Sequence, residues 1–474
     1  MTTTLLYAAG VVIFLVALFV SIALHELGHL FHAKKFGCRV SQYMIGFGPK
    51  IVSFTRGETE YGIKAIPLGG YVKIIGMMPP AAGEDIETAT FNARQLKALR
   101  EAAQEGDEVS EKQLLVRKSN TGMFAQLASD SRSAEFELVR PDDADRLFYK
   151  LPWHKKVLVM LAGPAVNIAL AFFCFLGVYS IYGVTSSVPT GSATIVGVSD
   201  CVIPAAEQRS DCRPGDPVSP ARAAGLEAGD QIVKFNDTVI KQWSQLSDLI
   251  HTNGDREVVF QVIRDGERVT LEPTRTTVLM RDMAQPGSHA QDMQAVGFLG
   301  VNPQTVSVTK HYGPIYTMQR MGEMTANAVS MVTDLPSRVW NVAASIVGHE
   351  QRDPDGPVSI IGGSRLAGEV ASSQAEGLQI ADKAMLLTMV VGSFNLFLGV
   401  FNLIPLLPLD GGHIAGAAYE GVRRGWAKLR RRPDPGYVDI ARQLPIAYCV
   451  GFVFLVMSGV LLLGDLVVPL SSGL

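Results

Sequence analysis

The chain has 474 residues, of which 47% are hydrophobic, and its mean hydropathy is +0.21. This composition is too apolar for an ordinary soluble protein and too mixed for a pure bundle of membrane helices, so we expect several membrane spans together with soluble parts. The net charge of −3 gives no support for nucleic-acid binding, and the five cysteines form no Cys-x-x-Cys pair, which argues against a cysteine zinc ribbon or a thioredoxin-like site.

An apolar segment at residues 5–24 contains 20 residues and no charge. A helix of this length matches a hydrocarbon core of about 30 Å. A cleaved signal peptide is the alternative, but it would begin with basic residues and end at a small-residue cleavage site. This segment is followed instead by Lys34, Lys35 and Arg39, so we expect residues 1–36 to form a retained transmembrane helix.

The end of this first span carries a His-Glu-Leu-Gly-His motif at residues 25–29. Residues four apart share one face of a helix, so His25 and His29 can bind one zinc ion, with Glu26 beside them as a general base. His32 shares the face but lies about 10.5 Å from His25 along the helix axis, which makes it a poor third ligand. An interfacial helix whose polar residues face loops is the structural alternative.

Two segments of different composition follow the first span. Residues 40–78 contain the alternating, glycine-bearing stretch YGIKAIPLGGYVKIIG, which predicts a hairpin or a looped sheet. Residues 81–150 are polar and helix-prone, and we interpret them as a cytoplasmic insertion that is helical or partly disordered.

A second apolar stretch predicts a transmembrane helix within residues 151–184. Residues 219–273 then read as a small α/β module with a Gly-Asp turn, a helix near 243–252 and two strands around Arg-Asp-Gly-Glu. This order resembles a PDZ domain, a module that binds peptide strands or chain ends at a sheet edge, and we assign it to residues 185–275. Residues 276–383 are mixed in character and are assigned only as an extracytoplasmic or juxtamembrane segment.

Two further apolar stretches predict a third transmembrane helix within residues 384–412 and a fourth, with a tail, within residues 446–474. The third ends in NLIPLLPLDGG, where Pro405 and Pro408 break the helix and Asp410 is an unpaired carboxylate. An acid at membrane depth is costly unless it meets a cation, so Asp410 is the better candidate for a third zinc ligand. An Asp at a helix-ending turn near the interface is the alternative.

Basic residues predict the orientation of the four spans. They cluster after the first span, before the second, and in the segment 413–445 between the third and the fourth. The three clusters are Lys34, Lys35 and Arg39; Lys155 and Lys156; and Arg423, Arg424, Lys428, Arg430, Arg431 and Arg432. All three lie on the cytoplasmic side if the N-terminus is outside and the spans alternate. Residues 185–383 and the C-terminal tail are then expected outside, and the histidine motif near the cytoplasmic side.

Cys201 and Cys212 bracket ten residues on the expected outer face. A disulfide between them is expected in an oxidising compartment, with two free thiols as the alternative. Non-reducing mass spectrometry that found both thiols alkylated would remove the disulfide.

The motifs at residues 25–29 and 402–411 together resemble the site-two protease family of intramembrane zinc metalloproteases. Further matching stretches are GFGP at 46–49, IPLGGYVKIIGM at 66–77 and AGPAVN at 162–167. The resemblance covers nearly the whole chain and is strongest to the bacterial regulator-of-sigma-E type with a single PDZ domain, of the actinobacterial branch. It implies a multi-pass α-helical membrane protein with four transmembrane helices, a membrane-associated β-loop at 37–80 and an extracytoplasmic α/β PDZ-like domain.

The resemblance also implies residue roles. Zinc would be held by His25, His29 and Asp410, and Glu26 would activate water. The β-loop would pair with the substrate as an added strand. The implied substrate-binding residues are Asn402, Pro405, Gly69, Gly70 and Tyr71.

These features predict an intramembrane zinc endopeptidase in the bacterial plasma membrane, surrounded by lipid and without a nucleic-acid partner. Its expected substrates are single-pass membrane proteins, such as anti-sigma factors already cut by an upstream extracytoplasmic protease, and remnant signal peptides. A transmembrane helix hides its peptide bonds in internal hydrogen bonds, so the enzyme must unwind it and admit water. The alternative function is a non-catalytic PDZ-bearing scaffold or chaperone with a degenerate metal site, but the set of two histidines, glutamate and aspartate is complete.

Overall fold

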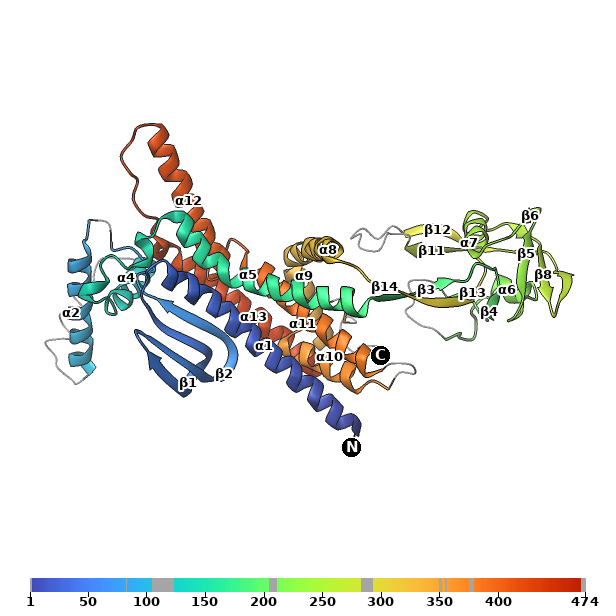
Figure 1. Ribbon diagram of the computed structural model, residues 1–474, viewed down its shortest axis with the longest axis horizontal. Coiled ribbons are helices and arrows are strands. Elements are labelled where there is room, and N and C mark those ends of the chain that lie inside the picture. The colour runs from blue at the N-terminus through green and yellow to red at the C-terminus, as the bar shows by residue number, and fades with distance from the viewer. Residues whose placement is uncertain are drawn as a thin grey trace. The chain divides into compact units, whose positions relative to one another are not determined.

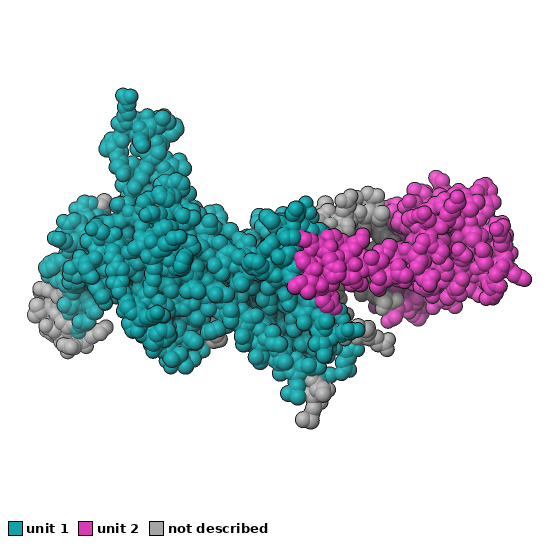
Figure 2. Space-filling view, in the orientation of Figure 1, with its two compact units in different colours: residues 1–178, 314–474 teal, residues 179–313 magenta. Residues whose placement is uncertain are grey.

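The computed structural model describes residues 2–81, 83–104, 123–203, 211–282, 293–348, 352–353, 356–374 and 379–469. Much of the expected insertion, at residues 105–122, lies outside this set, as does the end of the C-terminal tail. The described chain divides into two compact units (Figure 2). Unit 1 comprises residues 1–178 and 314–474, and unit 2 comprises residues 179–313.

Unit 1 is mainly helical (Figure 1). Its helices are α1 (Thr2–Lys35), α2 (Ile86–Gln104), α4 (Met123–Phe136), α5 (Trp153–Gly177), α8 (Pro314–Thr333), α9 (Leu335–Ile346), α10 (Ile360–Ser372), α11 (Ile380–Asn402), α12 (Asp410–Leu429) and α13 (Leu444–Val467). Short helical turns lie at Pro141–Asp143, Phe148–Lys150 and Ile440–Gln443. Four segments containing α1, α5, α11 and α13 are long and apolar enough to cross a membrane, so the structure has as many candidate spans as the sequence predicted.

Helices α1, α5 and α11 form the centre of unit 1. Helix α1 packs against α5, α10 and α11, and α5 packs against α11 and α12. Glycines permit these close approaches: a Cβ on Gly28 of α1 would lie 2.7 Å from the carbonyl oxygen of Ala162 on α5. A Cβ on Gly399 of α11 would lie 2.8 Å from the side chain of Ile168 on α5. Small residues at helix contacts are typical of membrane bundles, and here they bring the histidine turn of α1 against α5.

The β region after α1 is confirmed as a twisted antiparallel pair, β1 (Val40–Arg56) and β2 (Thr59–Ile74). Both strands are bent by bulges, so that residues 42–45 pair with residues 60–63 on one side, while residues 40–45 pair with residues 70–74 on the other. Residues 70–74 therefore form an edge segment among the described strands. The other edge of this segment pairs with no strand among the described residues.

The insertion contains two described helices, α2 and α4, that pack on the β region. Ala89 and Ala93 of α2 and Phe136 at the end of α4 share a buried apolar cluster with Ile75, which follows β2. A carboxylate oxygen of Glu135 on α4 accepts hydrogen bonds from the backbone N–H groups just after β2. The helical part of this prediction is confirmed, and these helices are part of the folded unit rather than a loose appendage.

The described residues of unit 2 form short strands and two helices. Its strands are β3 (Val184–Pro189), β4 (Ile195–Val198), β5 (Gln231–Phe235), β6 (Thr238–Val239), β7 (Glu257–Val258), β8 (Phe260–Arg264), β9 (Glu267–Thr270), β10 (Thr274–Arg275), β11 (Thr277–Asp282), β12 (Met293–Phe298), β13 (Val301–Pro303) and β14 (Thr305–Lys310). The helices are α6 (Pro220–Ala223) and α7 (Trp243–Thr252), and a π-helical turn at Val178–Tyr182 leads into the unit. The predicted helix at 243–252 and the two strands around Arg-Asp-Gly-Glu are confirmed.

Strands from both ends of unit 2 pair with each other, which extends the unit beyond residue 275. The main sheet has the order β6-β5-β8-β9, while β13 pairs with β4 and β14 pairs with β3. The expected boundary at 275 was therefore too early. The sequence signal for β11 to β14 was weak because their partners are far away in the chain.

The expected third span, residues 384–412, is also different in the structure. Helix α11 ends at Asn402, and a turn containing Pro405 and Pro408 leads to a separate helix, α12, that begins at Asp410. The prolines end the helix as expected. The error lay in reading Asp410 as the end of the span, and most of the expected basic segment 413–445 is helical as well.

Candidate metal centre

Helix α1 places two histidines on one face, one turn apart. The Nε2 atoms of His25 and His29 lie 3.2 Å apart, and both side chains are buried. The Nδ1 atom of His29 lies 2.8 Å from the carbonyl oxygen of Val159 on α5. A proton on Nδ1 that is donated to this carbonyl leaves Nε2 free as a metal ligand, which is the usual way in which a neighbouring group orients a ligating histidine.

Asp410 reaches the same point from the other end of the chain. Its Oδ2 atom lies 3.2 Å from Nε2 of His25 and 3.3 Å from Nε2 of His29. Helix α12 begins at this residue, and the N-terminal end of a helix favours a carboxylate. The glycines that follow Asp410 allow the first turn of α12 to lie against the preceding turn, since a Cβ on Gly412 would lie 2.6 Å from the backbone nitrogen of Leu407.

These three side chains fit a bound zinc ion. One ligand atom from each of His25, His29 and Asp410 lies within 4.8 Å of the other two. Two imidazole nitrogens and one carboxylate oxygen form a typical donor set for catalytic zinc, which keeps its fourth position open. No other such group of three or more His, Cys, Asp or Glu side chains is found among the described residues.

Gly163 on α5 lines the metal centre and was not identified from the sequence as a site residue. A Cβ on Gly163 would collide with Nε2 of His29 and would lie 2.7 Å from Nε2 of His25. Any side chain here would therefore occupy the space between the ligand nitrogens and α5. The only sequence signal was its place in the AGPAVN stretch of the second span.

Glu26 lies between the histidines and the edge segment of the β region. A Cβ on Gly70 would lie 2.9 Å from Cγ of Glu26, so the strand passes close to this carboxylate side chain only because residue 70 is glycine. The neighbouring Gly69 has φ of +100°, a conformation that favours glycine. The hydroxyl of Tyr71 donates to Oε1 of Gln42 at 3.3 Å.

The remaining predicted site residues have less direct support. Asn402 is the last residue of α11, and Pro405 is exposed in the turn between α11 and α12. Their roles with substrate stay predictions.

His32 is not a third ligand in the structure, because its Nδ1 atom bonds the carbonyl oxygen of Gly28 within the same helix. Cys201 and Cys212 form a disulfide in unit 2.

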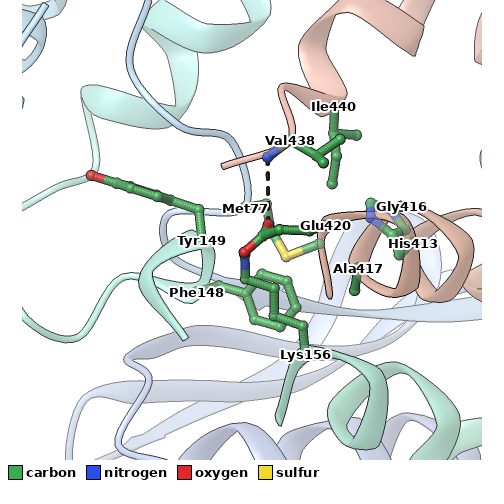
Figure 3. A pocket seen from close by; sticks show the side chains of 10 residues that line it. All are labelled: Met77, Phe148, Tyr149, Lys156, His413, Gly416, Ala417, Glu420, Val438 and Ile440. Atoms are coloured by element: carbon green, nitrogen blue, oxygen red, sulfur yellow. Dashed lines mark hydrogen bonds and ion pairs between the residues drawn. The ribbon is translucent and has the colours of Figure 1, made fainter. Parts of the chain in front are cut away.

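A narrow cavity of about 10 Å³ lies beside the start of α12, enough for roughly one water. Figure 3 shows His413, Lys156 and Glu420 among its lining side chains. Lys156 on α5 donates to Glu420 on α12 at 2.7 Å, and both side chains are buried. The Nδ1 atom of His413 is buried and has no hydrogen-bond partner among the described residues. The ion pair joins α12 to α5 about three turns after the candidate metal ligand Asp410.

Four candidate spans, together with two buried histidines and a partly buried aspartate that converge at one point, define a multi-pass membrane protein with a candidate metal centre. Residues 13–433 match peptidase family M50. The chain is 29% identical to zinc metalloprotease Rip1 of Mycobacterium tuberculosis over 483 residues, covering 98% of this chain and 99% of that protein. It is 30% identical to zinc metalloprotease Rip1 of Mycolicibacterium smegmatis, with the same coverage, and 26% identical to zinc metalloprotease RasP of Geobacillus kaustophilus, covering 87% and 90%.

The chain belongs to peptidase family M50, the site-two protease family, and is a zinc metalloprotease. The membership of the site-two protease family that the motifs predicted is confirmed. Membership implies intramembrane proteolysis of membrane-protein substrates. His25, His29 and Asp410 form the candidate zinc site.

Proposed function

We propose that this protease cuts peptide bonds within or near the transmembrane segments of single-pass membrane proteins, with His25, His29 and Asp410 as zinc ligands and Glu26 as general base. The observation that carries the proposal is the convergence of the three ligand side chains beside Glu26, which in turn lies against the edge segment at Gly70. A complete set of ligands and base favours an active enzyme over a scaffold with a degenerate site.

The chemistry follows from the positions of these side chains. Zinc in this site would supply a Lewis acid that polarises a carbonyl and acidifies water. Glu26 takes the proton from the attacking water and returns it to the amine of the leaving peptide. Val159 supports the reaction indirectly, because its carbonyl oxygen holds the ring orientation of His29.

We further propose that the edge segment at residues 70–74 holds an unwound substrate helix open. An unwound substrate has unpaired backbone N–H and C=O groups, and these can pair with a free strand edge. Gly70 brings this edge next to Glu26. Gly69, Gly70 and Tyr71 are therefore proposed to bind the scissile region as an added strand, and Asn402 and Pro405 to line its other side.

The proposed orientation places the N-terminus and unit 2 outside and the metal centre near the cytoplasmic side of the bacterial plasma membrane. It rests on the three basic clusters, which all fall on one side when the four spans alternate. The Cys201–Cys212 disulfide in unit 2 agrees with an oxidising outer compartment.

We assign unit 2 as a PDZ-like domain. The four-stranded sheet with α7 and the buried apolar core around it support this assignment. In this position the domain would dock the trimmed end of a substrate or exclude substrates with large outer domains. The proposed substrates are anti-sigma factors after a first extracytoplasmic cut, and remnant signal peptides.

The experiment uses the purified full-length protein in proteoliposomes with a tagged single-span substrate in two forms, one truncated outside and one with its outer domain intact. We expect zinc-dependent cleavage of the truncated form, a cut within or beside its transmembrane segment by mass spectrometry, and little cleavage of the intact form. Removal of zinc by a chelator should stop the reaction. Zinc-loaded protein that binds the truncated substrate without cutting it would favour the scaffold.

A further inference from the structure

Helix α12 has two faces of different character. One face is buried against the bundle, where Gly412, Gly416, Ala417 and Glu420 lie. Glu420 is held there by the buried ion pair with Lys156 at the start of α5 (Figure 3). This face accounts for the attachment of the helix to unit 1.

The opposite face carries an exposed apolar stripe. Its members are spaced three or four residues apart, which aligns them along one side of a helix. The stripe consists of Ala415, Tyr419, Val422, Trp426 and Leu429. Val422 is 70% exposed and Leu429 is 77% exposed. A row of large apolar side chains in water is unfavourable, and such a row marks a surface that meets a partner or a membrane.

Basic residues border the stripe at its far end. The side chains of Lys428, Arg430, Arg431 and Arg432 are exposed and form no ion pair among the described residues. The guanidinium of Arg430 lies 4.4 Å from the ring centre of Trp426. The nearest acidic residue in the sequence, Asp434, pairs with Arg424 and with none of these four side chains. The outer face therefore combines apolar and aromatic contacts with an uncompensated positive charge.

The position of α12 in unit 1 indicates where this face lies along the spans. A Cβ on Gly421 of α12 would lie 2.6 Å from the indole ring of Trp153, the first residue of α5. Helix α12 thus passes α5 where the second span begins. Trp side chains are common at the level of the lipid headgroups, and Trp153 is 43% exposed. Figure 1 shows α12 projecting from the bundle at this end of α5.

We propose that the outer face of α12 docks on the anionic phospholipid surface of the bilayer that holds the four spans. An apolar stripe bordered by lysine and arginine is the composition of helices that lie in the interface, with apolar side chains among the acyl chains and basic side chains at the phosphates. The charge of the patch complements a negative lipid surface. The occupant is therefore lipid rather than a second copy, which would bring two positive patches together.

The test is hydrogen exchange of residues 415–432 in the zinc-loaded full-length protein, with one copy per nanodisc. Nanodiscs of phosphatidylcholine alone are compared with nanodiscs that contain phosphatidylglycerol. We expect the amides of 419–429 to exchange roughly tenfold more slowly with the anionic lipid, because several basic side chains contribute. Replacing Lys428, Arg430, Arg431 and Arg432 with Gln should remove this difference.

A control variant loses four positive charges from unit 2 instead of from α12. Arg213, Lys241, Arg256 and Arg268 are exposed basic residues of unit 2, and their replacement by Gln should leave the lipid effect on α12 intact. Equal exchange in both lipids, or a lipid effect that survives loss of the four α12 charges, would overturn the proposal. The same exchange is measured in nanodiscs that hold two copies; protection that appears only there, without dependence on anionic lipid, would overturn the proposal and assign the face to self-association. The readout does not depend on proteolytic activity.

Discussion

The candidate metal centre and the core of unit 2 differ in how far apart in the sequence their residues lie. The metal centre joins His25 and His29 of one helix with Asp410, far away in the sequence, and Gly163 of a third segment closes it. The core of unit 2 is made by many apolar side chains from a single stretch of chain between Ala193 and Leu299. In the first region a few side chains are proposed to carry the chemistry, whereas in the second region many side chains share the stabilisation. Substitutions should therefore affect activity in one region and local stability in the other.

The largest effect is expected at the ligand that comes from the distant segment. Asp410→Ala should abolish cleavage and lower zinc content, because two histidines alone leave the donor set incomplete. Zinc content by plasma mass spectrometry and substrate cleavage in proteoliposomes measure both effects. The control is Asp145→Ala, since that side chain is fully exposed. If Asp410→Ala kept full zinc content, the third ligand would have to come from another residue.

Gly163→Ala should lower cleavage by about 100-fold, as a methyl group placed between the ligand nitrogens displaces the histidines from the productive geometry. Gly177→Ala on the same helix has open space around it and should behave like the wild type. Both variants are compared by single-turnover cleavage and zinc titration. Wild-type activity in Gly163→Ala would mean that α5 does not limit the space at the ligands.

A smaller effect, on stability alone, is expected for Arg264→Gln in unit 2. Arg264 donates from Nε and Nη2 to the buried carboxylate of Asp230, both at 2.8 Å. Loss of this charged hydrogen-bonded pair should lower the local free energy of unfolding by about 2 kcal/mol. Hydrogen exchange of β5 and β8 in the full-length protein measures the change, and exposed Arg268→Gln is the control. Unit 1 should retain its zinc in both variants.

The smallest effect is the pH dependence of the same contact. Burial alone would raise the pKa of Asp230, but hydrogen bonds from Arg264 and from the backbone N–H of Glu227 hold it below its usual value. A lowered pKa in the folded state means that the stabilisation is complete above the unfolded pKa of about 4 and is lost as the pH falls further. Exchange of β5, corrected for its intrinsic rate, should therefore report constant stability from pH 5 to 7 and falling stability below pH 4, with a weaker fall in Arg264→Gln. An equally steep fall in that variant would assign the acid sensitivity to other carboxylates.

The sequence predicted those parts of the fold that have a local signal. Uninterrupted apolar stretches identified the four spans, and helical spacing placed His25 and His29 together. The Gly-Asp and Arg-Asp-Gly-Glu turns identified α7 and its neighbouring strands. Each of these features depends on residues within about 20 positions of one another.

Features set by distant contacts could not be predicted in the same way. The role of Gly163 depends on histidines more than 130 residues earlier in the chain, and a glycine in an apolar span has no distinctive local signal. The edge segment at 70–74 depends on bulges that set the register of β1 and β2. The start of α12 at Asp410 could not be predicted because Gly411 and Gly412 follow it, and glycines usually mark the end of a helix rather than its first turn.

The most direct measurement is a parallel determination of zinc content and cleavage for the wild type, Glu26→Gln and Glu58→Gln. Glu58 is a half-exposed carboxylate of the β region, paired with Arg146 away from the metal ligands. We predict about one zinc per chain in all three proteins, and cleavage lowered by roughly 1,000-fold in Glu26→Gln alone, since only the base is lost. Undiminished cleavage by Glu26→Gln, or the absence of zinc from the wild type, would contradict the account.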